Sequence, residues 1–224
     1  MKLSFLPINS VINISELEET MPATKLKSIC AAICMSALAV SAFVQSAHAA
    51  DAAHRFMRTV ANKLQAAQRK PELLDRAASF TNVVKSYAHL GKIGHAALGD
   101  YQNQLRKNQR DIYYAGMAGW IGYYAAGEAI KYPVKKVLLT TTAKRDGNYY
   151  IIDSKVELEN AEVYDVRWFL VRFEQSFKVV EVQIDIGLGL TDITPYLRSI
   201  FVDHIEENDK SVANLVATLA RYSN

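Results

Sequence analysis

Few residues in this chain have the types and spacing that chemistry requires. Both cysteines lie within an N-terminal apolar stretch, so none is left to complete a zinc site. Four histidines follow residue 50, and they are scattered rather than spaced as in the H-E-x-x-H motif: His54, His89, His95 and His204. The sequence therefore predicts no metal site and no cofactor.

Three carboxylates, Asp165, Glu181 and Asp185, are the candidates for acid–base catalysis. Each alternates with apolar neighbours in a predicted strand, which places it on the polar face. A catalytic carboxylate needs burial beside an apolar pocket, because burial raises its pKa into the useful range. We expect these three to be solvated and structural.

Two further motifs of catalysis or cofactor binding are missing or incomplete. The sequence has no G-x-S-x-G nucleophile motif. Gly187 and Gly189 begin a G-x-G-x-x-G loop, but Asp192 stands where the third glycine should be, and no parallel strand follows. We therefore predict that the protein is not an enzyme.

The elements that would position functional groups change type at Pro133. After this residue, apolar and polar side chains alternate, as in an antiparallel sheet with one apolar face. Asp146-Gly147 is a strong signal for a hairpin turn. The four predicted strands are Val134–Ala143, Tyr149–Leu158, Val163–Phe173 and Phe177–Ile186.

The sequence before Pro133 is helical, with apolar residues at helical spacing in four segments. These are Phe56 to about Ala67, Pro71 to Val84, Ile93 to Tyr101, and Gln109 to about Lys131. The last segment contains three glycines, each of which costs up to about 1 kcal/mol relative to alanine. This cost indicates that a neighbouring helix or a ligand approaches the backbone at Gly116, Gly119 and Gly122.

Two helices end the chain. Thr194 as N-cap and Pro195 in the first turn predict a helix that runs to about Glu206, and apolar spacing predicts another over residues 212–219. The order of elements predicts an α+β fold: N-terminal helices, a four-stranded antiparallel meander with one apolar face, and two C-terminal helices.

An apolar strand face opposite an aromatic-rich helix can form either a solid core or the wall of a cavity. Base rates favour a solid core, and we expect about half of the candidates to be ordinary core residues. The candidate wall residues come from the long helix and from the last three strands: Tyr113, Met117, Trp120, Tyr150, Ile152, Val166, Trp168, Val180, Val182 and Ile184.

Residues 21–49 have the three parts of a cleavable secretory signal. Lys25 and Lys27 precede an apolar run, and Ala47-His48-Ala49 forms an A-x-A cleavage site. The run is shorter than the roughly 20 residues of a transmembrane helix. Because residues 1–20 are acidic, we expect translation to begin at Met21 and residues 1–20 not to be translated. The sequence thus predicts one exported domain over residues 50–224.

Charge excludes one class of partner. The chain carries 26 Lys and Arg against 23 Asp and Glu, and residues 1–49 contribute three of each, so the net charge is +3 with or without them. This is too small to predict nucleic-acid binding. It is compatible with weak attraction to anionic membranes.

Two segments carry a family resemblance. Gly94–Tyr101, with Gln109-Arg110 and Tyr113 after it, contains A-x-L-G-x-Y … Q-R-x-x-Y. The second segment comprises Phe177–Val182, Ile186–Leu190 and Arg198–Phe201. It follows the pattern W-K-V-x-D-V-x-x-x-G-V-S-L … R-S-x-F, although Phe, Glu and Gly replace the Trp, Asp and Ser of that pattern. Both segments resemble the MlaC-like family of periplasmic lipid-binding proteins, also called toluene-tolerance or ABC-transporter auxiliary proteins.

The resemblance implies a monomeric periplasmic carrier with a phospholipid in an apolar cavity. Its partners would be a membrane-bound ABC/MCE-type transport complex and an outer-membrane lipoprotein complex, and its role would be in outer-membrane lipid asymmetry. The departures leave open a hopanoid or other sterol-like lipid. Two other classes also stay open: an isomerase or dehydratase on a similar cone-shaped α+β scaffold, and an interaction protein with a solid core.

One surface could meet a transport partner. Five basic residues, Lys131, Lys135, Lys136, Lys144 and Arg145, gather around the first predicted hairpin. A solvated hairpin explains them equally well.

Overall fold

The computed structural model describes residues 48–223 apart from 186 and 188. The predicted start at Met21 and nearly all of the predicted signal lie outside the described residues. The residues from His48 onward form one compact unit. No helix in the described part is long and apolar enough to cross a membrane.

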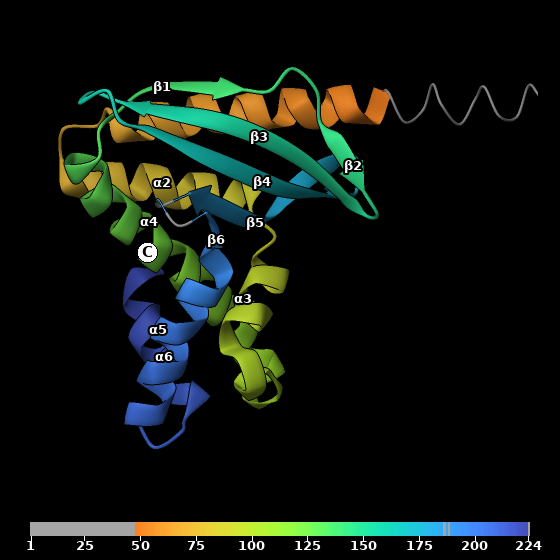
Figure 1. The fold of residues 1–224 in the computed structure, drawn as a ribbon. Helices are drawn as coiled ribbons and strands as arrows, with labels where there is room; N and C mark the ends of the chain where they lie inside the picture. Colours follow the sequence, from red (N-terminus) through yellow and green to blue (C-terminus); the bar gives the residue numbers. More distant parts are fainter. Residues whose placement is uncertain (1–47, 186, 188, 224) are drawn as a thin grey trace, which may run out of the picture. The chain divides into compact units, whose positions relative to one another are not determined.

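The centre of the unit is an antiparallel sheet in the order β1-β3-β4-β5-β6, with β2 also paired to β3 (Figure 1). The predicted meander is confirmed, but the strand count was approximate. The first predicted strand ends at Leu139 rather than Ala143, and two short strands, Lys144–Asp146 and Leu190–Asp192, were not predicted. The strands are β1 Val134–Leu139, β2 Lys144–Asp146, β3 Tyr149–Leu158, β4 Val163–Phe173, β5 Ser176–Asp185 and β6 Leu190–Asp192.

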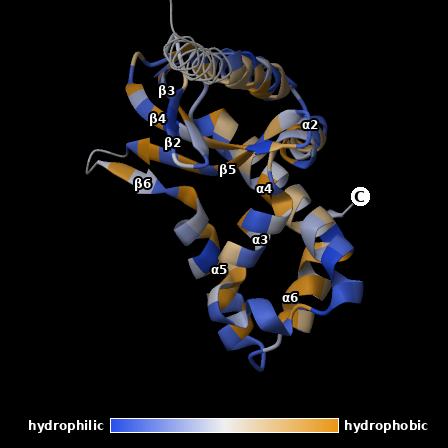
Figure 2. Ribbon diagram, turned by 90° about the vertical axis from the view of Figure 1, so that its right-hand side faces the viewer, coloured by the Kyte–Doolittle hydropathy of each residue, from blue (hydrophilic) through white to orange (hydrophobic). Residues whose placement is uncertain are grey.

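Helices precede and follow the sheet, which confirms the α+β class. The first helix covers described residues 48–68. The others are α2 Leu73–Tyr87, α3 Leu90–Leu98, α4 Arg110–Lys131, α5 Ile193–Glu207 and α6 Val212–Leu219. Short 3₁₀ turns occur at Gly99–Gln104, Lys107–Gln109 and Ala220–Tyr222. Figures 1 and 2 show the first helix and α2 beside the sheet, with α3, α5 and α6 grouped around α4.

The buried apolar residues divide into separate clusters. One joins the sheet to the first helix through Met57, Ile152 and Leu170. A second is helical and joins α3, α4, α5 and α6 through residues such as Met117 and Phe201. A small third cluster, with Phe80 and Ala126, lies between α2 and α4. The sheet and the helical group therefore have separate cores.

A β-bulge in β5 changes which of its residues face the first helix. Trp168 pairs with Val182, but Leu170 pairs with Val179, so β5 holds one extra residue. Before the bulge, Phe177 and Val179 belong to the core of the sheet. The predicted even-numbered alternation therefore holds only after the bulge, and it is wrong in placing Val180 in register with Val182.

Three glycines let other backbones approach α4. A Cβ at Gly116 would overlap Leu219, one at Gly119 would overlap the carbonyl oxygen of Tyr222, and one at Gly122 would lie 2.6 Å from the amide nitrogen of Thr81. Of the two alternatives left open by the sequence, close packing of protein segments accounts for all three positions.

We expect Gly119→Ala to lower the free energy of unfolding by about 1–3 kcal/mol, because overpacking forces the Tyr222 backbone away. Gly127→Ala is the matched control on the same helix, since no heavy atom lies within 4 Å of its Cβ position. The control should stabilise the protein by up to about 1 kcal/mol. Urea denaturation followed by circular dichroism measures both, and equal effects would contradict the packing explanation.

Candidate functional site

Except for Val180 at the bulge, the candidate residues on the sheet lie on one face, in rows across the strands. Ile152 pairs with Trp168, which pairs with Val182. This row adjoins the core of the sheet, where Ile152 is buried while Trp168 and Val182 are half-buried. The next row, Ser154–Val166–Ile184, belongs to none of the three clusters. The apolar face thus continues beyond the core that the first helix covers.

The candidates on α4 lie in the other core. Tyr113 and Met117 are fully buried among α3, α5 and α6. The Tyr113 hydroxyl donates a hydrogen bond of 2.8 Å to the carbonyl oxygen of Gly94, and burial raises the pKa of Tyr113 far above its usual value. Trp120 is half-buried at the margin of this cluster and stacks on Tyr124, with 5.5 Å between ring centroids.

The structure therefore does not bring the ten candidates into one wall. Five are buried within the protein: Tyr113, Met117, Tyr150, Ile152 and Val166. The other five are half-buried at the margins of the cores: Trp120, Trp168, Val180, Val182 and Ile184. Binding of a ligand by any of them stays a prediction.

Sequence reasoning missed four tyrosines near these margins. The hydroxyls of Tyr124 and Tyr196 lie 3.4 Å apart, joining α4 to α5. This hydrogen bond, with some burial and the charge of Glu128, raises the pKa of Tyr124 to about 12. Tyr132 lies near enough to raise the pKa of both Tyr124 and Tyr164, although the main cause at Tyr164 is its hydrogen bond to Glu162.

We call these four residues, Tyr124, Tyr132, Tyr164 and Tyr196, the tyrosine rim. Tyr124, Tyr132 and Tyr196 are each more than 40% exposed, at 43%, 51% and 49%. The rim combines apolar ring surface with hydroxyl groups that can donate and accept hydrogen bonds. Such side chains suit a boundary between an apolar surface and water.

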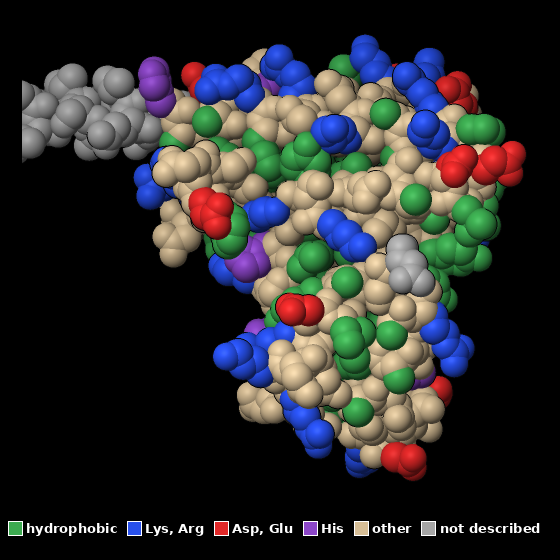
Figure 3. All heavy atoms as spheres, turned by 180° about the vertical axis from the view of Figure 1, so that it is seen from behind, with side chains coloured by type: hydrophobic (Ala, Val, Ile, Leu, Met, Phe, Trp, Pro, Cys, Tyr) green, Lys and Arg blue, Asp and Glu red, His purple; other side chains and the backbone are tan. Residues whose placement is uncertain are grey.

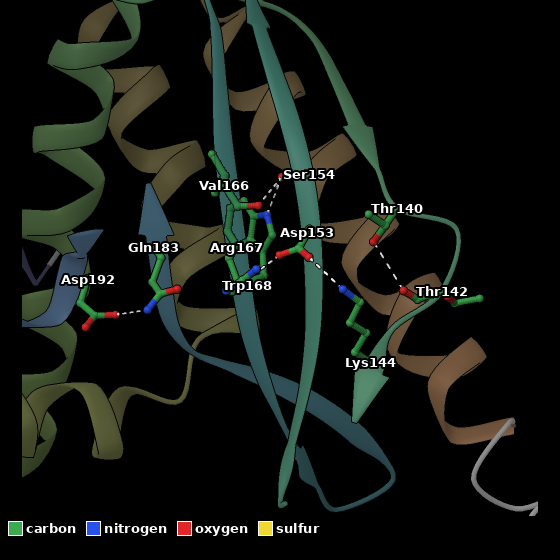
Figure 4. A network of polar contacts seen from close by, with 10 residues as sticks. All are labelled: Thr140, Thr142, Lys144, Asp153, Ser154, Val166, Arg167, Trp168, Gln183 and Asp192. Carbon is green, nitrogen blue, oxygen red and sulfur yellow. Dashed lines mark hydrogen bonds and ion pairs between the residues drawn. The ribbon is translucent and has the colours of Figure 1, made fainter. Parts of the chain in front are cut away.

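A hydrogen-bond chain fixes one aromatic candidate on the apolar face. The indole nitrogen of Trp168 donates to the Ser154 hydroxyl over 3.0 Å, and this hydroxyl donates to the Val166 carbonyl over 3.1 Å (Figure 4). Ser154 is the one polar residue of the row Ser154–Val166–Ile184, and its hydroxyl both accepts and donates a hydrogen bond. The hydrogen bond from the indole nitrogen therefore restrains the orientation of the indole ring.

The opposite face of the sheet is polar, as predicted. Asp153 accepts from Arg167 at 2.6 Å and lies 3.8 Å from Lys144, as Figure 4 shows. Asp165 pairs with Lys155 at 2.7 Å. Asp185 accepts from the backbone nitrogens of residues 187 and 189. The structural role expected for Asp165 and Asp185 is confirmed.

Two hollows among the described residues lie apart from these apolar margins. One of about 400 Å³ is lined by Asp51, His54, Arg55, Arg58, Leu139 and Thr141. The other, of about 300 Å³, is lined by Gly99, Asp100, Tyr101, Arg198, Val202 and Glu206. Both are mostly polar. Within the described residues, no group of His, Cys, Asp and Glu could hold a metal ion.

Comparison with known proteins decides the family. The sequence model of the MlaC protein family matches residues 52–221 of this chain. The chain belongs to the MlaC family. This confirms the resemblance of the two sequence segments. No curated protein matches the chain in sequence.

One solved structure shares the fold. It is a phospholipid-binding protein from Ralstonia solanacearum in complex with a phospholipid, with a TM-score of 0.57 and 19% identity. The match covers 78% of this chain and 97% of the other. At this identity the likeness shows the fold alone.

The two segments that resemble MlaC motifs contact each other in the fold. Arg198 from the second segment donates a hydrogen bond of 2.7 Å to the carbonyl oxygen of Ala96 in the first. The Arg198 side chain also packs on Gly99, which has a φ of +54°. Together with the bond from Tyr113 to Gly94, these contacts join α3, α4 and α5. The motif residues on α3, α4 and α5 therefore join the helices of the helical group.

Glu181 couples the sheet to α5. Its Oε1 accepts hydrogen bonds from the backbone nitrogens of Val182, at 2.9 Å, and Thr194, at 3.0 Å. The helix begins at Ile193, so the predicted N-cap at Thr194 is wrong, and the carboxylate of Glu181 satisfies the Thr194 amide instead. The expectation that Glu181 is structural is confirmed, but it is half-buried rather than fully solvated.

We expect Glu181→Ala to lower the free energy of unfolding by about 1–2 kcal/mol, because the Thr194 amide loses its acceptor at the start of α5. Glu181→Gln is the matched control, since its side-chain carbonyl can still accept. Thermal and urea unfolding measure both variants. If Glu181→Gln is as destabilising as Glu181→Ala, the negative charge rather than the hydrogen bonds is what matters.

Proposed function

We propose that this protein is a periplasmic lipid carrier. It binds the acyl chains of a phospholipid against the apolar face of its sheet. It moves the lipid between a membrane-bound ABC/MCE-type transport complex and an outer-membrane lipoprotein complex. Membership of the MlaC family and a fold shared with a protein that holds a phospholipid support this proposal.

The observation that carries the proposal is the extent of the apolar face. The row Ser154–Val166–Ile184 and the neighbouring pair Val156–Tyr164 extend the face past the core of the sheet. Ile184, Val156 and Tyr164 are only half-buried. A protein that needed only a solid core would gain stability by covering them, because apolar burial is worth about 25 cal/mol per Å².

A lipid with long acyl chains needs an apolar surface of this kind. Each CH₂ group of an acyl chain in water costs about 0.8 kcal/mol, so one long chain costs on the order of 10 kcal/mol. Ile184, Val156 and Tyr164 belong to none of the buried clusters, so a ligand can contact them without replacing a contact of either core. The tyrosine rim beside them offers hydroxyls that can hydrogen-bond to polar ester or phosphate groups at the water boundary.

The arrangement of ionisable groups favours binding over catalysis. The carboxylates tested for acid–base roles engage in ion pairs or backbone hydrogen bonds. His89 is the histidine whose pKa shifts, and burial lowers it, but its ring accepts a bond from the Lys92 amide and packs on Phe173. We therefore propose a non-enzymatic carrier.

We expect gently purified protein to carry lipid, detected by native mass spectrometry and by extraction with organic solvent. Ile184→Asp should reduce the lipid-bound fraction at least about tenfold, because a carboxylate beside an acyl chain must be desolvated. Val163→Asp is the matched control. It makes the same kind of change on the polar face of the neighbouring strand, where Val163 is 55% exposed.

Circular dichroism must show that both variants are folded. Lipid-free wild-type protein, or equal lipid loss in both variants, would contradict the proposed function. The mass of the extracted lipid separates a phospholipid from a hopanoid or sterol-like cargo.

A further inference from the structure

The basic residues on different surfaces of the molecule differ in whether they form ion pairs with acidic residues. Three of the hairpin lysines proposed for partner binding already have acidic partners: Lys131 with Glu128, Lys135 with Glu157 and Lys144 with Asp153. A lysine that already forms an ion pair attracts a second negatively charged partner less strongly. The hairpin is therefore a weaker docking surface than its sequence indicated.

The first helix shows the opposite arrangement. Positions 55, 58, 62, 66 and 69 follow helical spacing and are all exposed, while Ala53, Met57 and Val60 are buried on the other side. Arg55 and Arg58 lie on this outer stripe, and Arg69 continues it in the turn directly after the helix. Exposed Lys63 and Lys70 flank these residues. We call these five residues the cationic stripe.

Within the described residues, no member of the cationic stripe forms an ion pair. Arg58 contacts His54 at 3.4 Å, and Asp51 is the acidic residue of this helix. At a rise of about 1.5 Å per residue, the stripe extends about 20 Å from Arg55 to Arg69. Figure 3 shows Lys and Arg side chains along this part of the surface.

The cationic stripe is better suited to bind a flat, negatively charged surface than a groove on another protein. Between its cations lie small or polar residues, Thr59, Asn62 and Ala66, and no exposed aromatic or large apolar side chain. Protein interfaces usually have an apolar or aromatic centre that is poor in charge. The hollow beside Arg55 and Arg58 is also mainly polar.

We propose that the cationic stripe on the first helix docks the protein on an anionic membrane surface. This inference rests on the proposed carrier function only in giving the docking a purpose, since a carrier must bring its cargo to a bilayer. Each Lys or Arg near an anionic bilayer strengthens binding about fivefold, and salt screens the attraction over about 8 Å at physiological ionic strength.

The test measures binding of the purified protein to phosphatidylglycerol and phosphatidylcholine vesicles by co-sedimentation. The wild type should bind phosphatidylglycerol vesicles, bind phosphatidylcholine vesicles at least about tenfold more weakly, and lose binding as salt rises from about 0.05 to about 0.5 M. The triple variant Arg55→Gln, Arg58→Gln, Arg69→Gln should bind phosphatidylglycerol vesicles about a hundredfold more weakly.

The matched control removes three exposed cations elsewhere: Lys92→Gln, Lys107→Gln, Arg110→Gln. It has the same net charge as the triple variant and should bind nearly as the wild type does. Equal loss in the control, unchanged binding by the triple variant, or no binding of wild type to either vesicle overturns the docking proposal. Lipid extracted from the triple variant tests the carrier function separately, because that variant changes neither Ile184 nor any residue of the tyrosine rim.

Discussion

The rest of the structure depends on the single extra residue in β5. Because of this bulge, Phe177 and Val179 face the core on one side of it, and Val182 and Ile184 share that face on the other. The backbone next to the bulge also holds the helical group in place. The carbonyl oxygen of Val179 accepts from the His89 amide at 2.8 Å, and Glu181 reaches the first turn of α5. The bulge thus sets both the apolar face and the position of two helices.

The sheet and the helical group also have separate cores. The helical group is held together by its own backbone contacts, including those of Leu219 and Tyr222 at the glycines of α4. The sheet has its own apolar partner in the first helix. Ile184, Val156 and Tyr164 belong to neither core and are half-buried. The proposed carrier would hold its lipid against these residues.

The sequence predicted most of the fold because the signals were local. Helical spacing, alternation and the Asp-Gly turn are properties of neighbouring residues, and β4 begins and ends where alternation predicted. The bulge at Val180 was missed because a single alternation over the whole strand hides the shift of the apolar face from odd positions, Phe177 and Val179, to even positions, Val182 and Ile184. The start of α5 was misplaced because its cap comes from Glu181, thirteen residues earlier in the chain. For the candidate site, periodicity gave the face of each residue but could not show that the residues of α4 lie in a different core.

The tyrosine rim shows why a family motif need not include the residues of a proposed lipid-contact surface. The residues that carried the family resemblance, such as Ala96, Tyr113 and Arg198, are held by contacts with one another. They are constrained by packing, so their pattern is readable in a single sequence. Tyr124, Tyr132 and Tyr196 are exposed and follow no motif, and they come together only because α4 and α5 cross beside the sheet. A surface that meets a variable lipid needs amphipathic rings rather than fixed identities, so its residues are found from the fold and not from the motifs.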